Sequence, residues 1–183
     1  MKIRTATILR LRDALLKSGR RPTAVISTAY ETLARQGLLE PDEAAAVSRV
    51  EPLAEAMFLM TAADGKLTPS ERDAVRGAIR GMADGLIRSA TIDVMLENFA
   101  ARLIEHGRDQ RLHELAQELA EDPGEAEGAF LLAAAVALAD DEVADEENAF
   151  INQLADWFGI SSERSHAILD QLDEDRKSPP AQP

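Results

Sequence analysis

Apolar residues recur at three- and four-residue spacing along most of the chain, the spacing that places them on one face of an α-helix. Ser18-Gly19 closes the first such stripe, which consists of Ile8, Leu11 and Leu15. A second helix is predicted between Pro22 and Gln36, with Gly37 as its stop signal. No segment has a convincing strand pattern, so the sequence predicts an all-α fold.

A third helix is predicted to open at Pro41-Asp42-Glu43, because proline suits the first helical turn and acids suit the positive end of a helix. Its apolar face consists of Val47, Val50, Ala54, Met57 and Phe58. Pro52 lies inside this pattern. Since a proline within a helix removes a backbone hydrogen bond and crowds the preceding turn, we expect the helix to kink or split there.

The next helix has the clearest start signal in the chain. Thr68 suits the N-cap and Pro69 suits the first helical position. Glu71 can accept a hydrogen bond from the N-cap backbone, which would complete a capping box. The helix is predicted to end near Asp84-Gly85.

Later stripes complete a predicted bundle of about seven to eight helices. His106-Gly107 and Asp122-Pro123-Gly124 are the stop signals of two of them. Residues 130–139 are apolar on nearly every side, which predicts a helix at the centre of the bundle. Ser161 is predicted to cap a last helix that runs to Leu172, and the polar residues 173–183 are predicted to be disordered.

One segment occurs twice in the chain, at a shift of 76 positions. Ala63-Asp64 aligns with Ala139-Asp140, and Glu71 aligns with Glu147. Apolar positions of the flanking helices also align: Met60 with Val136, Val75 with Ile151, and Met82 with Phe158. Two such pairs of helices can bury each other about a pseudo-two-fold axis, which would bring their acidic turns into neighbouring positions.

The same residues carry a resemblance to a known family. The segments Met60 to Glu71, Ala139 to Glu147 and Leu154 to Ser161 resemble the TerB-like family of tellurite-resistance proteins, which includes the N-terminal region of DjlA-type co-chaperones. The resemblance covers roughly residues 50–172. It implies an all-α fold of about seven helices, a role in stress response rather than catalysis, and an acidic cluster that binds divalent cations.

Carried over by position, the metal ligands that the resemblance implies are Asp64, Glu71, Asp140 and Glu147. Carboxylates suit Ca²⁺ and Mg²⁺, and we expect weak binding because few ligands are preorganised. The turns are not EF-hand loops, because the first and third loop positions would fall on Met60, Ala62, Val136 and Leu138, whose side chains cannot ligate. Asp141 also departs from the first copy, which has Gly65 at that position.

The alternative interpretation of these acids needs no ligand. Asp64 can accept backbone N–H groups of its turn, and Glu71 can complete a capping box. Acids at the start of the helix that contains Glu147 suit the positive end of the helix dipole. The sequence leaves both interpretations open: a cation-binding module, or a protein-interaction scaffold in which the acids only cap helices.

Composition narrows the function classes. Apolar residues make up 45% of the 183 positions and aromatic residues only 4%, so the core is aliphatic. The formal net charge of −13 argues against a nucleic-acid binder. The absence of cysteine excludes disulfides and thiol chemistry and fits a cytoplasmic location. The longest apolar run, residues 129–139, is shorter than the roughly 20 residues that a membrane span needs.

Basic and acidic residues gather in different parts of the chain. Residues 1–35 hold eight basic residues and two acids, whereas residues 121–175 hold sixteen acids and one basic residue, Arg164. We interpret both as solvated helix surfaces whose charges attract each other; the alternative is an acidic face that collects cations or docks a protein partner. The basic segment 1–40 is expected to pack on the core, with contact to an anionic membrane surface as its alternative.

No motif indicates catalysis. The three histidines, His106, His113 and His166, lack the spacing of a metal site, and the first two are predicted to lie on different helices. The chain has no phosphate-binding loop and no nucleophile motif. Paired carboxylates could in principle act as acid and base, but nothing in the sequence marks a substrate pocket. The sequence therefore predicts a non-enzymatic module with a protein partner.

Overall fold

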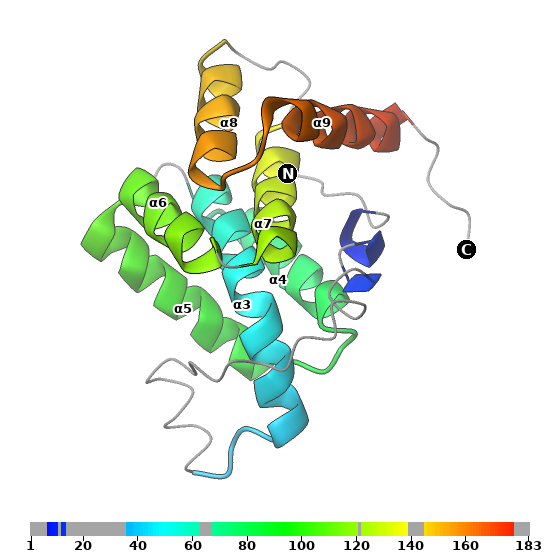
Figure 1. Ribbon diagram of the computed structural model, residues 1–183. Helices are drawn as coiled ribbons and strands as arrows, with labels where there is room; N and C mark the ends of the chain where they lie inside the picture. The colour runs from blue at the N-terminus through cyan, green and yellow to red at the C-terminus, as the bar shows by residue number, and fades with distance from the viewer. Residues whose placement is uncertain are drawn as a thin grey trace.

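The computed structural model describes residues 7–10, 12–13, 36–62, 67–120, 122–138 and 145–177, without the side chains of residues 145–148 and 176. All regular secondary structure in these residues is helical, so the predicted all-α class is confirmed. Figure 1 shows the complete helices of this part of the chain: α3 (Pro41–Thr61), α4 (Pro69–Met82), α5 (Ser89–His106), α6 (Arg108–Leu119), α7 (Pro123–Ala137), α8 (Asp145–Trp157) and α9 (Ser162–Lys177).

Helices α3 and α7 form the centre of the bundle and share the most extensive contact between any two of the described helices. The buried residues of α7 include Ala129, Ala133 and Ala134, and small side chains at a helix contact allow the two axes to approach closely. The prediction that the apolar stretch of residues 130–139 lies at the centre is confirmed for its described part, residues 130–138. Helices α5 and α6 lie on one side of this pair, and α8 and α9 lie towards one end (Figure 1).

Helix α3 continues through Pro52 as one helix of 21 residues, so the predicted split does not occur. An interior proline costs about 3 kcal/mol relative to a residue that can complete the backbone ladder. Burial offsets this cost, because the predicted apolar face is buried in full: Val47, Val50, Ala54, Met57 and Phe58. Phe58 also contacts the ring of Phe99 on α5, with the ring centroids 5.7 Å apart.

The predicted helix boundaries around α4 and α5 are confirmed. Thr68 is the N-cap of α4 and Pro69 its first residue. After α4 the chain turns through Asp84 and Gly85, which both have positive φ, and after α5 it turns through Gly107 with φ 79°. A left-handed backbone of this kind favours glycine, which explains why these positions end the two helices.

The boundaries of four helices fall in the register of the sequence repeat. The ends of α3 and α7, at Thr61 and Ala137, are 76 positions apart, as are the starts of α4 and α8, at Pro69 and Asp145. Aligned positions are buried in both copies: Val75 and Ile151, Ala78 and Leu154, Met82 and Phe158, and on the following helices Ile92 and Ile168, Leu96 and Leu172. Helix ends and burial follow this register in two trios, α3–α4–α5 and α7–α8–α9, while the internal repeat and its two-fold axis stay predictions.

The predicted boundary of a disordered tail at residue 173 is wrong. Helix α9 continues to Lys177. The ammonium group of Lys177 lies 2.5 Å from the carboxylate of Asp173, one turn earlier, and such a pair stabilises the end of a helix modestly. Residues 178–183 lie outside the described part of the chain.

Residues near the N-terminus contact the ends of α4 and α9. The hydroxyl of Thr7 donates to Asp175 at 3.3 Å, and Arg10 forms an ion pair with the same carboxylate. Arg12 lies 3.4 Å from Asp84, beside the end of α4. A basic N-terminal segment therefore meets acids of the bundle, as expected if these charges attract each other. Most of the predicted 1–40 extension, including its second helix, lies outside the described residues.

Of the helices that the structure describes, none combines the length and the apolar character needed to cross a bilayer. The longest, α3, carries charged residues through its centre, including Glu51 and Glu55.

Candidate functional site

The first acidic turn is described only on its C-terminal side. Glu71 is the third residue of α4, and its carboxylate accepts a hydrogen bond from the backbone N–H of Thr68 at 2.8 Å. The hydroxyl of Thr68 in turn accepts from the backbone N–H of Glu71 at 3.3 Å, which completes the predicted capping box. Asp64, the other predicted ligand of this turn, lies outside the described residues.

The second acidic turn joins α7 to α8. Asp140 lies outside the described residues, and Glu147 is the third residue of α8, without a described side chain. Glu71 alone among the four predicted ligands therefore has described side-chain geometry. Elsewhere in the described residues, no group of three or more acidic or histidine side chains is arranged to hold a metal ion. The prediction that the four carboxylates lie close together is therefore not tested by the described residues.

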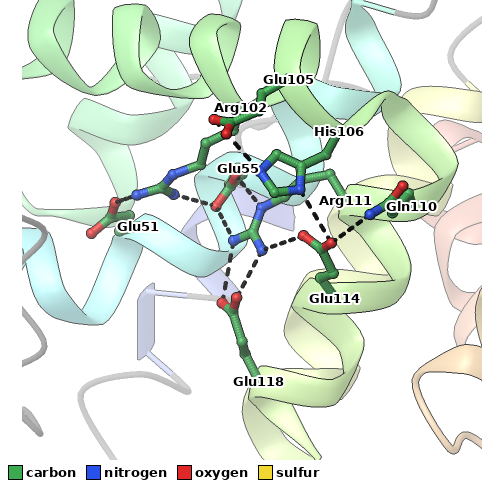
Figure 2. Close-up of polar contacts among 9 residues, drawn as sticks. All are labelled: Glu51, Glu55, Arg102, Glu105, His106, Gln110, Arg111, Glu114 and Glu118. Carbon is green, nitrogen blue, oxygen red and sulfur yellow. Dashed lines mark hydrogen bonds and ion pairs between the residues drawn. The ribbon is translucent and has the colours of Figure 1, made fainter.

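A network of buried charges, which the sequence analysis did not find, links α3, α5 and α6 (Figure 2). Glu55 of α3 is only 1% exposed and lies at its centre. Arg111 of α6 donates to both oxygens of Glu55, at 2.8 and 3.0 Å, and Arg102 of α5 donates to it at 2.7 Å. A buried carboxylate needs such compensation, because its transfer from water is costly unless it is paired and hydrogen-bonded.

The network extends towards solvent on two sides. Arg102 also donates to Glu51 at 3.1 Å, and Arg111 donates to Glu118 at 2.7 Å. Glu114 connects Arg111, at 3.4 Å, to the ring of His106 at the end of α5, at 3.2 Å. Figure 2 shows these side chains converging from three helices, so the network fixes α6 against the central helix.

Burial gives the groups of the network different proton affinities. Burial raises the pKa of Glu51 above its ordinary value, and the nearby Arg102 only partly offsets this. Burial lowers the pKa of Arg111, but its hydrogen bonds to Glu55 and Glu118 outweigh that effect and raise it. The hydrogen bond from Gln110 and the neighbouring His106 lower the pKa of Glu114. Glu51 therefore takes up a proton more readily than an exposed glutamate.

A second buried carboxylate anchors the start of α5. Glu43 of α3 is 4% exposed and accepts hydrogen bonds from the backbone N–H of Arg88, at 2.9 Å, and from the hydroxyl of Thr91, at 2.6 Å. The guanidinium of Arg88 donates to it at 2.8 Å. Burial raises the pKa of Glu43, but the hydrogen bonds from Arg88 and Thr91 outweigh this and lower it.

Aromatic contacts join α6 to α8. The rings of His113 of α6 and Trp157 pack in a T-shaped arrangement with centroids 5.5 Å apart, and Phe150 packs on Trp157 in the same way at 6.2 Å. The guanidinium of Arg108 lies 4.4 Å from the centroid of Phe150, a distance at which cation–π attraction is favourable. His106 and His113 lie on different helices, as predicted.

The comparisons with known proteins agree with the helical architecture. A family model described as "Tellurite resistance protein TerB" matches residues 51–170, which is more than half of the chain. No curated protein and no solved structure matches. The matched region begins within α3 and ends within α9, so it includes both trios apart from their outer ends.

Proposed function

The chain belongs to the TerB family, and on this premise we propose that it is a non-enzymatic binding module that holds a divalent cation weakly at its acidic turns. One observation carries the proposal: Glu71 and Glu147 occupy the same position, the third residue, in α4 and α8. Each of these helices follows one of the two paired central helices, α3 and α7. Such a duplicated arrangement would direct two sets of carboxylates towards a shared region.

The chemistry of these residues supports a hard cation. Ca²⁺ prefers six to eight oxygen ligands, and Mg²⁺ keeps several waters in an octahedral shell. Asp64, Glu71, Asp140 and Glu147 supply carboxylates, and backbone carbonyls of the turns can add further oxygens. Because Glu71 also serves its own capping box, we propose that binding is weak and that part of the coordination comes from water.

Thermal melting of the full chain with millimolar Ca²⁺, Mg²⁺, Mn²⁺ or Zn²⁺ tests this proposal. A ligand that binds the native state raises its melting temperature by mass action. We expect a rise in the wild type and its loss in the double variant Asp64→Asn, Asp140→Asn. Asparagine retains much of the capping ability of aspartate, so the variant isolates the charge. A melting temperature that no cation changes would contradict cation binding.

The capping box favours a second candidate function. Thr68 and Glu71 satisfy each other, so helix-end stabilisation alone accounts for Glu71. In this candidate the chain is a protein-interaction scaffold, and its acidic helices α8 and α9 form the face for a protein partner. The cation titration separates the two candidates, because a scaffold of this kind responds to ionic strength but not to the identity of the cation.

We propose stress response as the setting of this module, since the family is the tellurite-resistance type. We also propose a cytoplasmic location, because a chain without cysteine suits a reducing compartment and needs no disulfide. Binding rather than catalysis is proposed because the buried ionisable groups Glu43, Glu55 and Arg111 are held in ion pairs.

A further inference from the structure

A pocket opens between α3 and the turn that joins α4 to α5. Its volume is about 70 Å³, and Val50, Met82 and Ala83 form its apolar floor. Arg49, Asp84 and Leu86 also line it. Leu86 is 49% exposed, so part of an aliphatic side chain faces solvent at this pocket. The space is sufficient for one small aliphatic group.

Arg49 differs from the other arginines in the described part of the chain. Each of the others with a described side chain donates a hydrogen bond to a carboxylate or a hydroxyl: Arg10, Arg12, Arg72, Arg76, Arg80, Arg88, Arg102, Arg108, Arg111 and Arg164. Arg49 is half-buried and makes no hydrogen bond or ion pair in this part of the chain. An arginine without an ion pair is notable in a protein with 33 acids and a net charge of −13.

The pocket also carries an acid, Asp84, whose side chain is exposed. The guanidinium of Arg12 lies 3.4 Å from the carboxylate of Asp84 and also donates to Asp13, at 2.9 Å. The pocket therefore presents an apolar floor, an exposed leucine and a guanidinium that makes no ion pair in the described part of the chain. A ligand that complements all three carries an aliphatic group next to an anion.

We propose that this pocket binds a short acidic segment of a partner protein, which places an aliphatic side chain on the apolar floor and a carboxylate on Arg49. The guanidinium can bind the carboxylate through two parallel N–H groups. Because the protein as a whole is strongly acidic, the attraction is local, and salt screens it beyond about 8 Å at physiological ionic strength. The affinity is consequently low and falls as salt is added. This site is separate from the acidic turns and does not depend on cation binding there.

Methyl NMR of the full chain tests the proposal with two capped dipeptides, N-acetyl-leucyl-glutamyl amide and N-acetyl-leucyl-glutaminyl amide. The glutamyl peptide should shift the methyl signals of Val50, Met82 and Leu86. The glutaminyl peptide should bind about fivefold more weakly, since it lacks the charge that a partly exposed ion pair uses. N-acetyl-seryl-glutamyl amide, without the aliphatic group, should also bind more weakly.

Arg49→Gln is the decisive variant, because Arg49 makes no hydrogen bond or ion pair in the described part of the chain and the fold should persist. In this variant the glutamyl and glutaminyl peptides should bind equally. Arg80→Gln is the matched control, since Arg80 bonds to Ser89 and does not line the pocket, and it should keep the discrimination. Equal binding of both peptides to the wild type, shifts confined to other residues, or no shift at millimolar peptide would overturn the proposal.

Discussion

At the scale of the residue, Glu51 and Glu55 show how position within one helix decides the role of a charge. They lie one turn apart on α3, and both face Arg102. Glu55 accepts hydrogen bonds from two arginines and is enclosed by them. Within the described residues Glu51 is paired with Arg102 alone, and burial raises its pKa. The charge of Glu55 is therefore compensated by its surroundings, whereas the charge of Glu51 is only partly compensated.

Glutamine substitution should separate these two roles. Glu55→Gln keeps the shape but removes the charge that balances Arg102 and Arg111, so we expect a loss of about 3–5 kcal/mol in the free energy of unfolding. Glu51→Gln still accepts from Arg102 and removes an undercompensated charge, so we expect no loss or a gain near pH 7. Urea denaturation of both variants measures this, and equal losses would show that burial does not distinguish the two residues.

At the scale of the element, α4 contains a pair of glycines with different surroundings. A Cβ atom added at Gly77 would meet nothing within 4 Å. One added at Gly81 would lie 2.8 Å from the Cγ2 methyl of Ile8, a distance that real contacts do not reach. Gly81 therefore makes room for the N-terminal segment to approach α4.

Alanine at these two positions gives a matched comparison. Gly77→Ala should stabilise the fold by about 0.5–1 kcal/mol, because alanine loses less conformational freedom in a helix than glycine. Gly81→Ala should gain less, since Ile8 must move. Hydrogen exchange should show faster exchange at residues 7–10 in Gly81→Ala only. Equal exchange rates in both variants would contradict the contact.

Local signals in the sequence predicted most elements of this fold. The capping box at Thr68 and Glu71, the stop at Gly107 and the start at Ser161 depend on neighbours within four residues. The network around Glu55 was missed because its partners are 47 and 56 positions away in sequence. A clue was present, since Glu51 and Glu55 interrupt an otherwise apolar stretch of α3. The continuity of α3 through Pro52 likewise depends on tertiary packing that local propensity does not contain.

At the scale of the whole molecule, the buried carboxylates of Glu51 and Glu43 change the free energy of unfolding with pH in opposite directions. The pKa of Glu51 is raised in the folded state, so its contribution is present at low pH and is lost as the pH rises through the folded value. The pKa of Glu43 is lowered, so its contribution is present above the ordinary value near 4.5 and is lost as the pH falls.

Glutamine variants should resolve these two dependences. The free energy of unfolding of Glu51→Gln relative to wild type should increase from pH 4.5 to pH 7. Only the wild type has a carboxylate at position 51 that loses its proton over this range. Glu43→Gln should be costly at pH 7, and its cost should shrink as the pH falls below about 4.5. Chemical denaturation at a series of pH values measures both. Differences that do not vary with pH would show that neither carboxylate changes its pKa on folding.

The placement of α6 limits how such a chain can be divided. Helix α6 follows the first trio in sequence and buries Leu112, Leu115 and Leu119, yet it contacts helices of both trios: α3, α5, α7 and α8. A fragment that ends before α6 would uncover apolar surface on α3, and one that begins after it would uncover apolar surface on α8. Helix α6 is therefore packed against both trios, and we expect that neither trio can bury its apolar surface without it.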